Sequence, residues 1–270
     1  MVDEKAVEKA LDVIIAPAVE PGVIVDNKNS FDKNNFDKES WKPKTSIGKK
    51  VKSGEITSLN EIIDSGQRIM ESEIVDSFMP ALSSDMIMIG QAKGKFGGGQ
   101  RRAFKQTQKK TAEGNKPKFA TLIVIGNKDG FVGMGYGKAK ETVPAREKAM
   151  RNAKINIFKI RRGCGSWQCG CGEPHSIPFA VEGKCGSVQI RLMPAPKGTG
   201  LRIQGELQKI FVAAGVKDVW SSALGQTRST LNLVSACEAA LKKLSKTKVN
   251  ERQAASIGMI EGSISGARNE

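Results

Sequence analysis

Residues 119–160 constrain the fold more than any other stretch, because a strand-like pattern passes directly into a helical one. Residues 119–125 are an apolar run with β-branched side chains, and a second run, 131–136, follows the turn at Asp129 and Gly130. This order is typical of a β-hairpin. From about Thr142 the apolar residues follow a helical period, and Pro144 fits the first turn of a helix. The stretch therefore predicts a hairpin followed by a helix at residues 142–158.

Basic residues interleave with the apolar stripe of this predicted helix, and they leave much of its remaining surface cationic. They are Arg146, Lys148, Arg151, Lys154 and Lys159. A hairpin backed by a basic helix fits an RNA-facing surface, although many α+β domains share the same pattern.

The positive charge is concentrated in one part of the chain. The formal net charge is +15, with 43 Lys and Arg against 28 Asp and Glu in 270 residues. Residues 1–80 carry 11 basic and 15 acidic side chains, whereas residues 92–162 carry 19 basic and 4 acidic ones. A surplus of basic residues concentrated in one segment is typical of a protein that binds a polyanion, most commonly a nucleic acid. The alternative is a basic face that is solvent-exposed and binds no partner.

Composition also excludes several classes. No apolar run approaches the ~20 residues that cross a bilayer, and the early acids Asp3, Glu4 and Glu8 do not fit a secretory signal. Five cysteines in a chain of this length argue against a disulfide-framed secreted domain. We therefore expect an intracellular protein. A single histidine, His175, excludes enzymes that use paired histidines.

The first 80 residues predict only short elements. Residues 6–15 favour a short helix, and residues 20–45 have few apolar anchors and are expected to be extended or disordered alone. The segment from Trp41 to Lys50 has the character of a tail that a partner orders. Short helices are predicted at 58–64, with Ser58 and Glu61 as a capping box, and at 74–78.

Residues 91–118 mix five glycines with nine basic residues and are expected to form a loop. Glycines let such a backbone approach phosphate groups closely. Phe104 lies in its middle and Phe96 is its one other aromatic residue, so phosphate contact should dominate over base stacking. The alternative is a solvated, disordered loop in the isolated protein, which is compatible with ordering on RNA.

Beyond these segments, the chain predicts strands at 86–88, 176–181, 187–193 and 217–220, with helices at 206–214 and 230–244. Cys237 falls on the apolar face of the last helix and is expected to be a core residue. Residues 246–270 are polar and are expected to form a loosely attached tail.

One cluster has the residue types of a metal site. Cys164, Cys169, Cys171 and His175 lie within twelve residues that also contain three glycines and a proline. Three thiols and an imidazole can form a tetrahedral zinc site, although the spacing departs from the usual paired C-x-x-C. Cys185 is an alternative fourth ligand. The alternative is that the cluster binds no metal. The cysteines would then be reduced thiols packed near a strand end, with His175 hydrogen-bonded locally.

The glycines at 133, 135 and 137, followed by Lys138, have a superficial likeness to a nucleotide-binding fingerprint. Lys138 stands where the third glycine of G-x-G-x-x-G belongs, and Ala139 follows it where a P-loop has Ser or Thr. We expect a tight strand-to-helix connection whose backbone N–H groups and Lys138 touch phosphate. No catalytic set is legible, and no enzyme is predicted.

Several motifs in fixed order resemble the S-five family of small-subunit ribosomal proteins (S-two in eukaryotes). They are FATLIVIGNKDGFVGMGYGKAKETVPAREKAMRNAKINI, GSVQIRLMPAPKGTGL and VKDVWSSALGQTRSTLN. The resemblance covers roughly residues 55–245. Two further segments, RGCGSWQCGCGEPHSIPF and WKPKTSIGKKVKSGEITSLNEI, are similar to those of archaeal members.

The resemblance implies an α+β protein of two small domains with extensions at both ends. The first domain would resemble a double-stranded-RNA-binding fold, with a β-sheet packed on helix 142–158, and the second would have a β-α layout with a left-handed crossover. The implied boundaries are 1–80 for an N-terminal extension, partly disordered or ordered by a partner, 81–162 for the RNA-binding domain, 163–245 for the C-terminal domain with the cysteine-rich turn, and 246–270 for a C-terminal tail.

Members of this family bind small-subunit rRNA, neighbour the S-four family protein near the decoding centre and the mRNA entry side, and influence decoding accuracy. The resemblance therefore implies a cytoplasmic, ribosomal location and no membrane partner. The loop 91–118 would lie among rRNA, and Arg101, Arg102 and Lys105 are candidates for facing mRNA. This loop is longer than in bacterial members.

We predict a structural ribosomal protein in which basic side chains neutralise phosphates and two packed domains hold RNA helices in register. The alternative is a free double-stranded-RNA-binding regulator. No cofactor is predicted beyond a structural zinc at the cysteine cluster. The residues predicted to contact RNA are Lys93, Lys95, Arg101, Arg102, Lys105, Lys118, Lys128, Lys138, Lys140, Arg161, Arg162, Lys197 and Arg228.

Overall fold

The computed structural model describes residues 38, 40–92 and 99–263, all of which belong to one compact unit, Phe36–Glu270. The helix predicted at 6–15 and most of the segment 20–45 lie outside the described residues. In chain order the elements are α2 (Ser46–Ser53), α3 (Leu59–Asp64), α4 (Ser72–Phe78), β1 (Ser83–Ile87), β2 (Lys105–Thr111), β3 (Gly114–Gly126), β4 (Phe131–Ala139), α5 (Thr142–Ile155), β5 (Ile157–Lys159), β6 (Arg161–Arg162), β7 (Val181–Cys185), β8 (Val188–Pro194), β9 (Leu201–Arg202), α6 (Gly205–Ala214), β10 (Val219–Leu224), α7 (Thr230–Lys246), α8 (Glu251–Ile257) and β11 (Ile260–Glu261).

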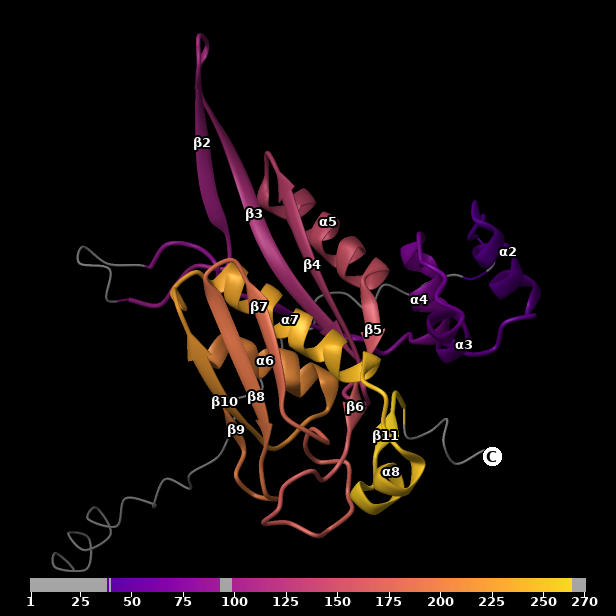
Figure 1. Cartoon of the computed structure of the whole chain (residues 1–270). Helices are drawn as coiled ribbons and strands as arrows, with labels where there is room; N and C mark the ends of the chain where they lie inside the picture. The colour runs from indigo at the N-terminus through magenta and orange to yellow at the C-terminus, as the bar shows by residue number, and fades with distance from the viewer. Residues whose placement is uncertain (1–37, 39, 93–98, 264–270) are drawn as a thin grey trace, which may run out of the picture. The chain divides into compact units, whose positions relative to one another are not determined.

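The first sheet is antiparallel and has the order β1-β3-β4-β5, with β2 paired to β3 beyond this path. It contains the predicted hairpin, β3 and β4, and α5 packs on one of its faces (Figure 1). A Cβ at Gly135 would lie 2.1 Å from the backbone oxygen of Ala149. The glycines of β4 therefore allow a close helix–sheet approach and do not form a nucleotide loop. The helix ends at Ile155 rather than at residue 158, because Ile157 and Phe158 pair with β4.

The prediction of a loop at 91–118 is wrong for its second half. Residues 105–111 and 114–126 form a long hairpin, β2–β3, that extends beyond the body of the sheet (Figure 1). The ladder runs from Lys105 opposite Ala120 to Thr111 opposite Gly114. Most side chains of β2 are exposed, so no face of this strand is buried. The hydrophobic alternation that reveals a half-buried strand is therefore missing from the sequence.

The second sheet has the order β7-β8-β10-β9 and packs mainly against α7. The strand predicted at 176–181 is wrong, because β7 begins only at Val181. Ser176 forms a single bridge with Gly163, and the buried Pro178 next to it has no N–H for a ladder. The helices predicted at 206–214 and 230–244 correspond to α6 and α7.

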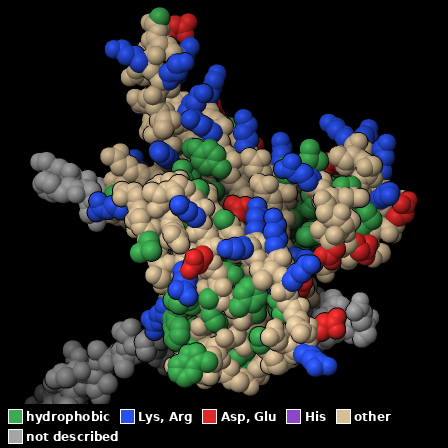
Figure 2. All heavy atoms as spheres, viewed as in Figure 1, with side chains coloured by type: hydrophobic (Ala, Val, Ile, Leu, Met, Phe, Trp, Pro, Cys, Tyr) green, Lys and Arg blue, Asp and Glu red, His purple; other side chains and the backbone are tan. Residues whose placement is uncertain are grey.

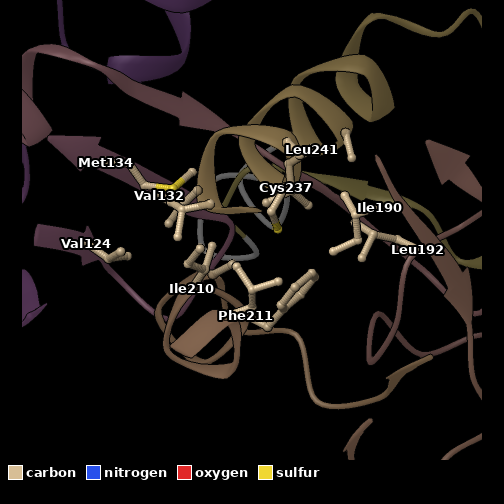
Figure 3. Close-up of a cluster of buried hydrophobic side chains, with 14 of the residues drawn as sticks. Val124, Val132, Met134, Ile190, Leu192, Ile210, Phe211, Cys237 and Leu241 are labelled. Carbon is tan, nitrogen blue, oxygen red and sulfur yellow. The ribbon is translucent and has the colours of Figure 1, made fainter. Parts of the chain in front are cut away.

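One hydrophobic core joins the two sheets (Figure 3). Val132 and Met134 from β4 meet Ile210 and Phe211 from α6, and the same cluster continues into β8 and α7. Cys237 of α7 is fully buried in it, which confirms the core prediction, and burial raises the pKa of its thiol to about 12. The mixed α/β architecture agrees with the predicted class at this coarse level.

The helices α2, α3 and α4 share a second core, in which Trp41 and Ile74 are buried. The predicted helix at 58–64 is confirmed, and the Ser58 hydroxyl caps it by accepting a hydrogen bond from the N–H of Glu61. The tail that the sequence predicts around Trp41 contains a regular helix, α2, which the sequence reasoning missed.

The C-terminal segment is not loosely attached, contrary to the prediction. Residues 251–257 form α8, and β11 pairs antiparallel with β6. The Cys164 N–H donates to the backbone oxygen of Ile257 at 2.9 Å. These contacts are made by backbone groups, which explains why a polar sequence gives no sign of them.

Candidate nucleic-acid interface and metal centre

Antiparallel register brings together lysines that are far apart in the sequence. Opposite Ala120 lie Lys105 on one side and Lys138 on the other, and Lys118 lies opposite Thr107 one step further out. Residues directly opposite in a ladder point to the same face, so Lys105, Lys118 and Lys138 share one face of the sheet. Ile123 and Ile125, of the other parity, pack against α5. The lysine face is therefore the one turned away from α5.

The same face continues outward along the hairpin through Lys109 and Lys116, which are opposite each other. Both are exposed, and Lys116 pairs with Glu113 near the tip at 2.7 Å. Tyr136 lies on this face of β4 and is 43% exposed. We call the set Lys105, Lys109, Lys116, Lys118 and Lys138 the hairpin lysines. Sequence reasoning missed the alternation that unites them, because it treated the segment as a loop.

Arg101 and Arg228 are brought together in a different place. The Arg101 guanidinium donates to the backbone oxygen of Arg228 at 3.0 Å and to the hydroxyl of Thr230. Arg101 therefore ties the chain before β2 to the start of α7. The side chains of Arg102 and Arg228 remain exposed.

The other predicted RNA contacts are scattered. Lys128 is exposed in the β3–β4 turn, and its φ of 59° places it in the left-handed region. Lys140 is exposed just before α5, and Lys197 is exposed and paired with Glu173 at 2.7 Å. Lys93 and Lys95 lie outside the described residues.

Arg161 and Arg162 point into the fold rather than away from it. Arg162 is 3% exposed, pairs with Asp129 at 2.6 Å and donates to the backbone oxygen of Gly262 at 3.0 Å. Arg161 pairs with Glu261 at 3.3 Å. Arg162 is thus a structural cation, and the structure gives no support for its direct contact with RNA.

The cysteine cluster converges as the sequence predicts. The ligand atoms of Cys164, Cys169, Cys171 and His175 all lie within 4.8 Å of one another. The two thiols of Cys169 and Cys171 are 3.4 Å apart, and the Cys169 sulfur is 3.8 Å from Nε2 of His175. A tetrahedron with zinc–sulfur bonds of about 2.3 Å has edges of about 3.8 Å, so these spacings fit zinc. Cys185 is not part of the converging set.

A buried carboxylate orients the histidine. Nδ1 of His175 is 2.8 Å from Oδ2 of Asp218, and both side chains are about 5% exposed or less. Because the carboxylate accepts, Nδ1 carries the proton, and Nε2 presents its lone pair to the thiols. Asp218 is held in turn, since its Oδ1 accepts from the N–H of Gly200 at 2.8 Å. The spacing of the cysteines could not reveal Asp218, which is 43 residues from His175.

The thiols have different environments. A hydrogen bond from the backbone N–H of Lys197, helped by Cys171, lowers the pKa of the Cys169 thiol to about 6. Burial raises the pKa of the Cys164 thiol. The thiolate is the metal-binding form of cysteine, so Cys169 is already suited to ligation near neutral pH.

Helices that could cross a membrane are absent from the part of the chain that the structure describes. A basic mixed α/β chain with a protruding face of lysines has the features of a nucleic-acid-binding protein.

Comparison with known proteins defines the family. Residues 101–161 match the model of the ribosomal protein S5 N-terminal domain, and residues 183–255 match that of the C-terminal domain. The chain belongs to the ribosomal protein S5 family, as the sequence motifs predict.

Several archaeal relatives are similar over most of the chain, and each is named small ribosomal subunit protein uS5. The protein of Nanoarchaeum equitans is 47% identical over 226 residues, which are 84% of this chain and 97% of the relative. That of Methanocaldococcus jannaschii is 42% identical over 230 residues, 85% and 99% of the two chains. That of Methanothermobacter thermautotrophicus is 44% identical over 225 residues, 83% and 97%. Family membership also supports the predicted structural, non-enzymatic role.

Proposed function

We propose that this protein is a structural constituent of the small ribosomal subunit and binds rRNA in the ribosomes of the cytoplasm. Family membership carries this proposal, together with the face of hairpin lysines that the sheet register creates. Lysines on a rigid antiparallel hairpin meet phosphates at fixed spacing, so little order has to be gained on binding.

We also propose that the chain is divided into two domains with the boundaries predicted from the sequence. Residues 81–162 are an RNA-binding domain that resembles the double-stranded-RNA-binding fold, and residues 163–245 are a C-terminal domain with a left-handed crossover. The antiparallel strands packed on α5 support the first assignment. The parallel pairing of β9 with β10 around α6 supports a crossover connection in the second. Residues 1–80 and 246–270 are extensions of these domains.

Within the subunit, we assign the protein to the decoding region, beside the S-four family protein and near the mRNA entry side. Arg102 and Lys105 are exposed and remain candidates for facing mRNA. Arg101 takes a positioning role, because its guanidinium already bonds to the start of α7. A free double-stranded-RNA-binding regulator remains the alternative, which predicts shape-dependent binding to generic duplexes.

Two sets of substitutions test where RNA binds. Replacing Lys105, Lys109 and Lys118 with Gln should weaken binding to small-subunit rRNA and flatten its salt dependence by about 2 to 3 in the log–log slope. The matched set is Arg146, Lys148 and Arg151 of α5, also replaced with Gln. A larger loss in the α5 set would contradict the choice of the hairpin.

We also propose that Cys164, Cys169, Cys171 and His175 hold a structural zinc ion. Four protein ligands would close the coordination sphere, which fits a structural role and leaves no open position for catalysis. Protein purified without added metal should contain one zinc per chain by atomic emission. Zinc at background level in folded protein would contradict this proposal.

A further inference from the structure

Five lysines form a patch on the N-terminal helical segment. This segment lies outside residues 92–162, where the basic surplus of the chain is concentrated. Residues 42–52 contain five lysines and no acid, although residues 1–80 as a whole are acidic. Their side chains are all exposed, and they gather over α2 (Figure 2). We call this set the α2 patch: Lys42, Lys44, Lys49, Lys50 and Lys52.

The backbone under the patch is held firmly. Trp41, only 8% exposed, anchors the segment before α2 in the core of the three N-terminal helices. The Glu71 carboxylate accepts from the N–H groups of Lys44 and Thr45, at 2.8 and 2.6 Å. The hydroxyl of Thr45 caps the helix by accepting from the N–H of Gly48 at 3.0 Å. The lysines are therefore presented by an ordered surface.

The lysines of α2 lie on its outer side. Val51 and Gly48 are buried, and Ile47 packs against the same core. At 100° per residue, Lys49 falls on the side opposite these residues, and Lys50 and Lys52 flank it at the two edges of that side.

Two of the acids that follow the patch pair with cations outside it. Asp76 pairs with Lys154 of α5 at 2.7 Å, and Asp64 pairs with Lys159 of β5. Glu71 is used by the backbone beside the patch, as described above. The acidic balance of residues 1–80 thus conceals a local cationic surface at residues 42–52.

Helix stability alone does not account for the patch. Lys50 and Lys52 lie in the last turn of α2, where positive charge favours the carbonyl end of a helix. Lys52 also donates to the backbone oxygen of Trp41. Neither effect applies to Lys42 and Lys44, which precede the helix, or to Lys49.

The chemistry of the patch favours phosphate over a protein partner. Protein interfaces are centred on buried aromatic or apolar side chains and are depleted in lysine. Among the described residues before β1, Met70 is the one large apolar side chain with high exposure, and it lies outside the 42–52 segment. Closely spaced ammonium groups on a polar surface suit the regular negative charge of a nucleic-acid backbone.

We infer that the α2 patch is a second RNA-binding surface, which contacts the phosphodiester backbone of small-subunit rRNA independently of the hairpin lysines. This inference rests on the proposed function, since it takes rRNA as the ligand. It gives the N-terminal extension a nucleic-acid partner in place of the acidic or protein-binding role that its overall charge suggests.

The test compares two variants with equal net charge in binding to the small-subunit rRNA transcript of the same organism. The patch variant carries Lys42→Gln, Lys44→Gln, Lys49→Gln and Lys50→Gln. The control carries Lys184→Gln, Lys217→Gln, Lys243→Gln and Lys248→Gln, all at exposed positions. The log–log salt slope of the patch variant should fall by about 3, and that of the control by less than about 1. Hydroxyl-radical footprinting should show one protected rRNA segment lost only in the patch variant.

The possible outcomes distinguish failure of the α2-patch inference from failure of the proposed function. A patch variant that equals the control in slope and footprint, while the hairpin variant loses affinity, overturns this inference and leaves the proposed function intact. Wild-type protein that shows no salt-dependent rRNA binding overturns the proposed function itself. A photo-crosslinking amino acid at position 49 that labels only protein in intact small subunits also overturns the inference.

Discussion

At the scale of single residues, the roles of Arg162 and Asp218 depend on contacts with residues distant in the sequence, so the spacing of motifs does not reveal them. Arg162 stands next to Arg161 in a strongly basic segment, and its surroundings in the sequence suggest RNA contact. In the fold it is buried against Asp129 and the backbone of Gly262. A basic side chain is therefore exposed at Lys105 and buried at Arg162, and only burial distinguishes the two positions.

Replacing Arg162 with Met should destabilise the protein by about 2–4 kcal/mol, because Asp129 and the Gly262 oxygen lose their partner. Urea unfolding followed by circular dichroism measures the change. Arg102→Met, at an exposed position, is the control and should stay within about 0.5 kcal/mol. Equal stabilities for the two variants would contradict the structural role of Arg162.

Asp218 is the second such residue, because it fixes the tautomer of His175. An amide at this position can donate to Nδ1, which leaves the proton on Nε2 and disfavours ligation. Asp218→Asn should therefore lower zinc affinity about 10- to 100-fold in a competition titration with a chromophoric chelator. Asp85→Asn, at an exposed position of β1, should leave the affinity unchanged. An unchanged affinity in Asp218→Asn would show that the carboxylate does not orient the ligand.

At the scale of elements, helices and strands with one buried face were predicted correctly from the sequence. Elements without a buried apolar face were missed. The β3–β4 pair and the helices α5, α6 and α7 carry apolar periods, and the structure confirms them. In contrast, β2 alternates Lys, Gln and Thr on two solvent-exposed faces, and α8–β11 attaches mainly through backbone groups. The grouping of Cys164, Cys169, Cys171 and His175 was predictable because they are close in sequence. In contrast, Asp218 and the shared face of the hairpin lysines depend on pairing between distant segments.

The contact between α5 and β4 depends on glycine at Gly135. A methyl group there would lie 2.1 Å from the Ala149 oxygen and 2.2 Å from the Ala153 nitrogen, so the helix must move away from the sheet. Gly135→Ala should cost about 2–3 kcal/mol in the free energy of unfolding. Gly205→Ala, whose added methyl group meets open space at the start of α6, is the matched control. Loss of stability in Gly205→Ala alone would contradict this packing argument.

The C-terminal segment should depend on the metal. A Cβ at Gly258 would lie 1.8 Å from the oxygen of Gly172, and Ile257 accepts from Cys164, so α8 rests on the cysteine turn. Removing zinc with a chelator should therefore increase hydrogen exchange in residues 251–261 by at least tenfold. The amides of β3, in the first sheet, serve as the internal control. Equal exchange with and without zinc would contradict this coupling.

At the scale of the whole molecule, two sheets joined by one core present cations on separate surfaces. The hairpin lysines extend from the first sheet, and the α2 patch lies on the N-terminal helices. A protein built in this way can hold more than one RNA segment at fixed separation. Its contribution to the subunit is positional, and its affinity for RNA should fall steeply with salt.

The position of the endogenous protein in a sucrose gradient of a cell lysate tests the central claim most directly. A structural ribosomal protein should sediment with small subunits and with whole ribosomes, in constant proportion to small-subunit rRNA. Treatment with ribonuclease that disrupts the subunits should move it to the top of the gradient. Protein found mainly at the top before that treatment, or bound to duplex RNA outside the subunit peak, would contradict the account.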